Sequence, residues 1–212
     1  MSHRLDRPVW NALNTRHAAL AQGDGLAKRY APSIHPFASS RDESPESLAG
    51  LAGIASAGET LIFLQADEFV LPPGFAVTMT TSGVQMIAER HMPLIEDDRI
   101  VQLGEADAAD MLELATLTRP GPFTLKALSL GSFWGIRENG RLIAMAGERL
   151  KQDGLTELSG VCSHPDHQRK GLGRLMTLYT AGKPSPRASS PSCTPLRPTA
   201  PRSDFTSRSA ST

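Results

Sequence analysis

The sequence contains few cysteines, no surplus of either charge and no long apolar segment. Its two cysteines, Cys162 and Cys193, supply neither a disulfide framework nor the ligand set of a structural zinc site. Lysine plus arginine number 22, the same as aspartate plus glutamate, so the chain lacks the positive field that attracts nucleic acid. No run approaches the roughly 20 apolar residues of a membrane-spanning helix, and residues 1–10 lack a signal peptide's apolar core. These absences predict a cytoplasmic protein with no nucleic-acid or membrane partner.

The 212 residues allow one good-sized domain and a smaller companion, and most of the chain has ordinary globular composition. A proline and an acidic cluster near residues 93–98 mark a boundary. Residues 1–97 therefore predict an N-terminal α/β extension. Its expected elements are a helix in 7–21, an irregular surface loop in 23–47, a short helix in 47–56, and strands in 59–67 and 76–90.

Residues 98–183 show a clearer alternation of strand and helix. A strand in 99–104 and a helix in 105–118 precede two apolar runs that flank Asn139-Gly140, the strongest hairpin signal in the chain. A third strand, 155–163, leads to a helix that begins near Leu172. The order predicts an α/β class in which the helices pack on a mixed sheet.

The tail, residues 184–212, is dominated by proline, serine, arginine, threonine and alanine. It has no hydrophobic periodicity, and we expect it to be disordered, with neither a helix nor a central strand. Two interpretations remain: a natural linker-type tail, or translation in a shifted reading frame, because the change falls where the apolar face of the preceding helix is still unfinished.

The stretch "QRKGLGR", Gln168–Arg174, places two glycines at the start of a helix. Helix N-termini carry unpaired N–H groups and the positive end of the dipole, so they bind anions. Glycine removes the Cβ that would hold a phosphate away, and three cationic side chains stand beside the amides. The pattern predicts a pyrophosphate cradle; the alternative is an ordinary turn with helix capping. The third glycine of a dinucleotide fingerprint and the Gly-Lys-Ser/Thr of a nucleotide-triphosphate loop are both missing.

These residues resemble the acyl-coenzyme A motif of the GCN5-related N-acetyltransferase (GNAT) family. In that motif a strand is followed by proline and then by Gln/Arg-x-x-Gly-x-Gly/Ala at the start of a helix, and the matching positions here are Val161, Pro165, Gln168, Gly171 and Gly173. The resemblance implies a GNAT-like acyl-CoA N-acyltransferase fold over 98–183. Residues 1–97 would be a family-specific extension or a degenerate copy of the fold.

The resemblance also implies a mechanism and a set of site residues. Acetyl-CoA would be the co-substrate, with its pantetheine arm on the strand before the motif and with no metal. The implied coenzyme-binding residues are Val161, Cys162, Gln168, Arg169, Lys170, Gly171, Leu172, Gly173 and Arg174. Glu157 would be the base that takes the acceptor's ammonium proton; the alternative is a solvated carboxylate at the end of the strand. The apolar run around Cys162 favours a small buried hydrophobe rather than a nucleophile. His164 and His167 have no carboxylate or cysteine at metal-ligand spacing, so we expect them to be loop residues.

The family fold continues with a further strand, a tyrosine that protonates the leaving thiolate, and a closing hairpin, for which the tail offers no match. The fold therefore reads as truncated, with an unpaired sheet edge. Two functions stay under consideration: an N-acetyltransferase acting on a primary amine, or a coenzyme-binding module with little activity. The acceptor is a small amine, a peptide or a protein amine, and a homodimer is left open.

Overall fold

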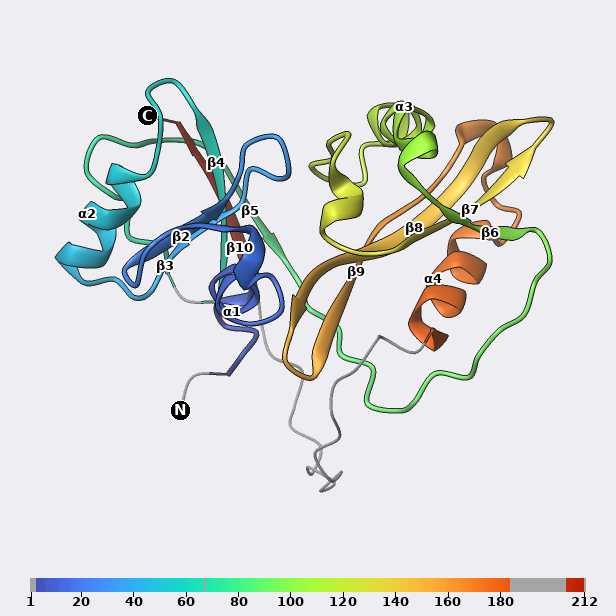
Figure 1. Ribbon diagram of the computed structural model, residues 1–212, viewed down its shortest axis with the longest axis horizontal. Helices are drawn as coiled ribbons and strands as arrows, with labels where there is room; N and C mark the ends of the chain where they lie inside the picture. The colour runs from blue at the N-terminus through green and yellow to red at the C-terminus, as the bar shows by residue number, and fades with distance from the viewer. Residues whose placement is uncertain (1–2, 67, 184–204, 212) are drawn as a thin grey trace.

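The computed structural model describes residues 3–66, 68–183 and 205–211, arranged as two halves side by side (Figure 1). The N-terminal half contains a sheet in the order β1-β2-β3 and a second in the order β4-β10-β5. Its elements are α1 (Pro8–Asn14), η1 (Ala18–Leu20), β1 (Ala21–Gly23), β2 (Ala27–Tyr30), β3 (Ala38–Ser40), α2 (Pro45–Gly53), β4 (Thr60–Gln65) and β5 (Ala76–Gly83).

The second half is an antiparallel sheet in the order β6-β7-β8-β9, with one helix on each face (Figure 1). Its elements are β6 (Ile100–Leu103), η2 (Glu105–Asp107), α3 (Ala108–Thr118), η3 (Ala127–Ser129), β7 (Phe133–Glu138), β8 (Arg141–Gln152), β9 (Leu155–Ser163), η4 (Pro165–His167) and α4 (Leu172–Gly182). Together these elements confirm the predicted mixed α/β class and the predicted element order of residues 98–183.

The two faces of this sheet are separate apolar layers because strand side chains alternate. Met111 and Leu114 of α3 pack with Cys162 on one face. Met176 and Tyr179 of α4 pack with Trp134 on the other. The sheet is thus covered on both sides, and α3 and α4 lie on opposite faces.

The turn between β7 and β8 has the predicted form. Asn139 and Gly140 both have positive φ, 50° and 80°, as a two-residue type I′ hairpin turn requires. The strand that follows the hairpin was also predicted with the bounds the structure gives it, Leu155–Ser163.

A bulge interrupts the pairing of β8 with β9. Met145 pairs with Cys162 and Gly147 with Ser159, so β9 carries one extra residue between these pairs. Gly160 lies in the bulge with φ 64°, and a Cβ there would lie 2.9 Å from the Phe133 ring. The bulge therefore depends on glycine, both for its conformation and for its closeness to β7.

The two halves share a buried hydrogen-bond bridge at His17. The ring Nδ1 of His17 lies 2.8 Å from the Tyr30 hydroxyl, and Nε2 lies 2.9 Å from the Leu130 carbonyl oxygen. Burial lowers the pKa of His17 to about 4, although the bond to Leu130 opposes the shift. At neutral pH the ring is therefore uncharged: Nε2–H donates to Leu130 and Nδ1 accepts from Tyr30.

Strand β10 (Phe205–Ser211) corrects the expectation that the tail contains no central strand. It lies between β4 and β5 and pairs antiparallel with both. Proline occurs up to Pro201 but not in residues 205–211, so every residue of β10 keeps the N–H group that a ladder needs. The expectation of disorder for residues 184–204 falls outside the described residues.

The irregular loop expected in residues 23–47 is also corrected. The segment contains β2, β3 and the start of α2, and β2 pairs with both β1 and β3. Some of the turn-forming residues that suggested a loop, such as Gly25 and Pro32, lie in the connections, whereas Ser39 and Ser40 belong to β3 and Pro45 to α2.

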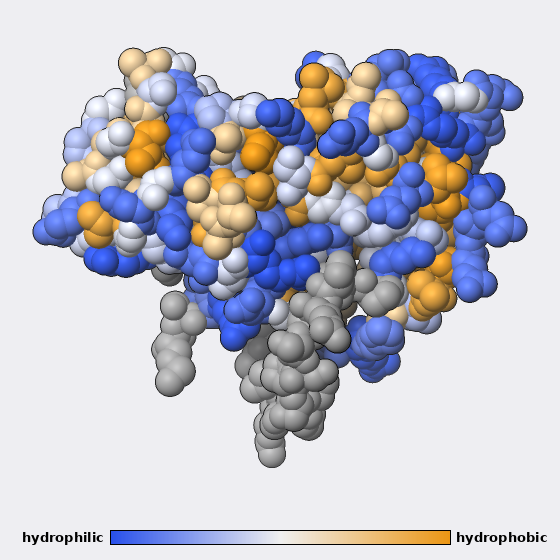
Figure 2. All heavy atoms as spheres, viewed as in Figure 1, coloured by the Kyte–Doolittle hydropathy of each residue, from blue (hydrophilic) through white to orange (hydrophobic). Residues whose placement is uncertain are grey.

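The surface is mixed in character. Figure 2 shows hydrophilic residues over much of one face, with apolar residues in smaller groups among them. In the part of the chain that the structure describes, no helix is long and apolar enough to cross a membrane.

We expect the free energy of unfolding to fall as pH is lowered from about 6.5 toward 4. In this range the unfolded chain binds a proton at His17 and the folded chain does not. The contribution of the neutral His17 to stability is therefore fully present above the unfolded pKa of about 6.5. Below that pH it decreases by at most about 1.4 kcal/mol per pH unit. Chemical denaturation at pH 7.5 and 5 measures the change. The difference in unfolding free energy between the two pH values should be smaller in His17→Gln than in the parent chain. It should be unaltered in His91→Gln, an exposed control. Equal differences in both variants would contradict the assignment of this pH dependence to His17.

Candidate active site

The predicted anion cradle is a short loop between β9 and α4. Arg169 and Gly171 both have positive φ, 61° and 76°, and no side chain caps the first turn of α4. Alternation of left-handed residues turns successive N–H groups toward one side and forms a concave anion site. A left-handed conformation is unfavourable for arginine, so the loop maintains a geometry that sequence preference alone would not give.

The residues predicted to bind the coenzyme around this loop divide into two kinds. Gln168, Arg169, Lys170 and Arg174 are exposed and can reach a bound anion. Leu172, by contrast, is buried against the sheet with Met176, so only its backbone can take part. Gly173 has no atom within 4 Å of a Cβ built on it. The approach to the start of α4 is therefore unobstructed.

Strand β9 is at the edge of its sheet. Among residues 3–66, 68–183 and 205–211, β8 is the one strand that pairs with it. The His164 N–H donates to the Ile143 carbonyl at 2.7 Å, which turns the backbone of residue 164 toward β8. Because N–H groups alternate along a strand, Cys162 also faces β8, while Val161 faces the outer edge. Of the two predicted pantetheine partners, Val161 is placed to form backbone hydrogen bonds there.

Glu157 lies four residues before Val161 and is held by Arg149 of β8. Arg149 Nε and Nη2 donate to the two carboxylate oxygens of Glu157 at 2.9 and 2.7 Å. The side chains are 17% and 38% exposed, respectively, so solvent reaches the carboxylate more than the guanidinium.

Glu157 and α4 lie on opposite faces of the sheet. Thr156 and Leu158 line a pocket together with Thr180 of α4. Glu157 stands between them in the strand and therefore points to the other face, where α3 lies. The cradle is thus at the end of β9 with α4, on one face of the sheet. The predicted base, Glu157, points to the other face.

His164 and His167 have structural partners in the loop after β9. His164 Nδ1 accepts from the Asp166 N–H at 3.2 Å, and His167 Nε2 lies 2.7 Å from a carboxylate oxygen of Glu138. Within the described residues, no group of three or more histidine, cysteine, aspartate and glutamate side chains is arranged to hold a metal ion.

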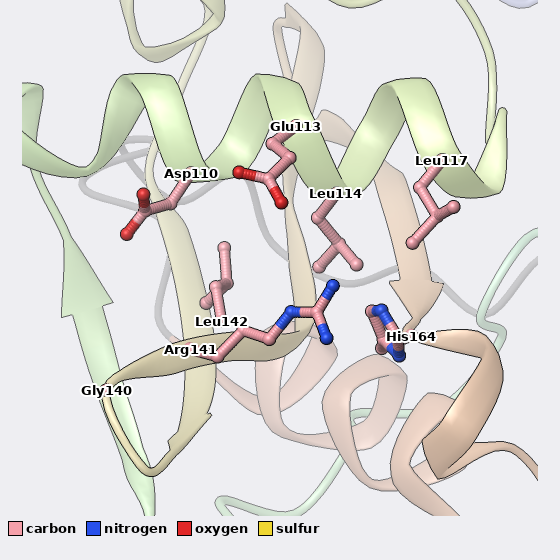
Figure 3. Close-up of a pocket in the computed structure, with 8 residues that line it drawn as sticks. All are labelled: Asp110, Glu113, Leu114, Leu117, Gly140, Arg141, Leu142 and His164. Atoms are coloured by element: carbon pink, nitrogen blue, oxygen red, sulfur yellow. The ribbon is translucent and has the colours of Figure 1, made fainter.

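Two pockets lie near this half. The first, about 70 Å³, has Asp110 and Glu113 of α3 facing Arg141 and His164 (Figure 3). It is smaller than the roughly 300 Å³ at which small-molecule pockets begin. The second, about 300 Å³, lies among the β8–β9 hairpin, the end of α4 and Arg16. Neither is lined by residues 168–174, so the predicted coenzyme site is a surface cradle.

Sequence reasoning missed Arg149, Gly160 and Phe37. Arg149 reaches Glu157 because strands β8 and β9 pair in a particular register. Its guanidinium also lies 4.9 Å from the centre of the Phe37 ring. Sequence spacing reveals neither contact. Gly160 did carry a signal, since a glycine inside a strand often marks a bulge.

Comparison with known proteins agrees with this arrangement. The family model named FR47-like protein matches residues 133–183, from β7 to just past α4. A crystal structure assigned to the GNAT acetyltransferases, from Novosphingobium aromaticivorans DSM 12444, aligns over 99% of both chains with 30% identity and a TM-score of 0.83. A GCN5-related N-acetyltransferase from Kribbella flavida aligns over 95% of this chain and 91% of its own, with 14% identity and a TM-score of 0.53, a likeness of fold alone. Comparison with curated proteins finds no match. The GNAT-like fold that the motif predicts is confirmed.

We expect Cys162 to react slowly with thiol reagents in the folded protein. It is buried, and burial raises the pKa of its thiol, so little thiolate forms near neutral pH. In a Cys193→Ser background, labelling at pH 8 should be slow until denaturant is added. Rapid labelling of the native chain would show that the thiol is accessible and would reopen a nucleophilic role.

Proposed function

The chain belongs to the GNAT family of acetyltransferases, and on that premise we propose that it transfers an acetyl group from acetyl-CoA to a primary amine. The class, acyltransferase, follows from the family; the acetyl donor and the amine acceptor are the proposal. The observation that carries it is the uncapped start of α4, with its left-handed Gly171, next to the edge strand β9.

Binding of acetyl-CoA would use the cradle and the strand edge together. The N–H groups of residues 169–173 would surround the diphosphate, and the three exposed cations Arg169, Lys170 and Arg174 would neutralise its charge. The pantetheine arm would then run along the outer edge of β9 and pair with the backbone of Val161. This route leads the thioester toward the bulge at Gly160, where the strand changes direction.

Acetyl transfer would proceed by direct attack. Glu157 would accept the first ammonium proton of the acceptor, and the amine nitrogen would attack the thioester carbonyl carbon. A C–N bond forms, the C–S bond breaks, the nitrogen gives its second proton to solvent, and CoA leaves as a thiolate that takes a proton from solvent. Because Arg149 occupies both oxygens of Glu157, this base role requires one of these bonds to be released when the acceptor arrives.

A second candidate is binding of acetyl-CoA without turnover. Two features favour it: the outer edge of β9 has no strand partner in the described residues, and both tyrosines, Tyr30 and Tyr179, are buried rather than placed beside the cradle. Burial also raises the pKa of Tyr30, which makes it a poor proton donor to a thiolate. Cytoplasmic location and a homodimer stay predictions.

We expect Gly173→Asp to weaken acetyl-CoA binding by at least about tenfold while leaving the fold intact. The added side chain meets no protein atom at its Cβ, but its negative charge stands where the diphosphate would approach the helix. Gly53→Asp is the matched control, because a Cβ at this last residue of α2 also meets nothing. Isothermal titration with acetyl-CoA measures affinity, and the melting temperature checks the fold.

Equal affinity in the two variants, or no binding to the parent chain, would overturn the cradle. Release of free CoA in the presence of a panel of primary amines then separates the two candidates. Binding with amine-dependent release supports acetyl transfer, whereas binding without release with any amine supports the binding-only function.

A further inference from the structure

Arg149 has the geometry of a carboxylate-binding site, and in this structure the carboxylate that it binds is the protein's own Glu157. Both bonds join the fork of one guanidinium to the two oxygens of one carboxylate. This is the bidentate geometry by which arginine recognises carboxylates in general. A ligand carboxylate has the same shape and can exchange with Glu157 on Arg149.

An aromatic ring holds the guanidinium in place. The guanidinium lies over the Phe37 ring, 4.9 Å from the ring centre. Stacking on an aromatic face fixes the plane of the fork. A residue of the N-terminal half therefore orients a side chain of the β8–β9 hairpin.

The histidine beside this stack adds no second positive charge. The His35 ring packs against Phe37 with centroids 4.0 Å apart and is buried. Burial, together with the nearby Arg149 charge, lowers the pKa of His35 to about 3. Arg149 is thus paired with one carboxylate, and the imidazole beside the stack is neutral near pH 7.

The pair lies on the α3 face of the sheet, and Glu157 belongs to β9, the strand along which the pantetheine arm is proposed to run. Glu157 points to that face, and the bulge at Gly160 separates it from Val161, the proposed partner of pantetheine. Resting on the acetyl transfer proposed above, we propose that the acceptor is a free α-amino acid, whose carboxylate binds Arg149 and whose ammonium group meets the displaced Glu157.

An α-amino acid satisfies both side chains because its two charged groups are attached to the same carbon. Its carboxylate replaces Glu157 on the arginine fork, and the freed Glu157 then takes a proton from the adjacent ammonium group. Binding of the correct acceptor thus releases the base, while an amine without a carboxylate leaves Glu157 paired with Arg149. Arg149 is then the residue that determines specificity.

The test compares acceptors that differ in the carboxylate alone. Alanine, valine and phenylalanine are each compared with ethylamine, isobutylamine and phenethylamine, and CoA release from acetyl-CoA gives kcat and KM. We expect a preference of at least about tenfold in kcat/KM for at least one amino acid over its amine. Arg149→Gln should abolish the preference mainly by raising KM for the amino acid. Because Glu157 is no longer paired with Arg149 in this variant, the rate with the amine should rise.

Three further variants separate specificity from folding. Arg149→Lys keeps the charge but not the fork, so it should retain only part of the preference. Glu157→Gln should still bind the amino acid while kcat falls. Arg99→Gln breaks an exposed ion pair with Asp97 at 2.7 Å and is the matched control, in which the preference should be unchanged. The melting temperature of each variant checks that it is folded.

Titration calorimetry with the same amino acids, with and without CoA, decides the inference independently of turnover. Amino-acid binding that is lost in Arg149→Gln supports it. It is overturned if amino acids bind no better than their amines, or if Arg149→Gln binds them as well as the parent chain does. The proposed function fails separately, by absence of acetyl-CoA binding to the parent chain.

Discussion

Strand β8 pairs with β7 along one edge and with β9 along the other. It is long enough to contact α3 and α4 in one part and α1 in another. In its first part Ala144 and Met145 lie in the layers beneath the two helices, whereas Leu150 near its end packs with Val9 and Leu13 of α1. One continuous strand therefore joins both cores. The bulge on β9, the exposed strand edge and the Arg149–Glu157 pair all depend on where β9 is held against β8.

Local signals predicted the second half because its elements are specified by neighbouring residues. Asn139-Gly140 adopts the turn that its sequence favours, and the glycines after Lys170 stand at the start of a helix where the motif places them. The cradle could be predicted because its residues are contiguous. Arg149 could not, since its contact with Glu157 depends on strand register and its contact with Phe37 on packing between distant segments.

The N-terminal half was harder to predict because its strands are short and pair across turns. Residues Ala27–Tyr30 and Ala38–Ser40 carry little apolar alternation, so nothing local distinguishes them from loop. Their hydrogen bonds come from each other and from β1. In the same way, β10 forms from a serine-rich segment because β4 and β5 offer it a ladder on both sides, which composition does not reveal.

The position of β10 also sets an order of folding. Strands β4 and β5 are made early in synthesis, but the strand that joins them lies beyond residues 84–204. Contacts of such long sequence separation form slowly because a large loop must close first. The sheet containing β8, β9 and the cradle consists of segments closer together in the sequence, so shorter loops must close before its strands pair. The N-terminal half therefore completes its second sheet last, and until then the facing edges of β4 and β5 are exposed to chaperones and to other unfinished chains.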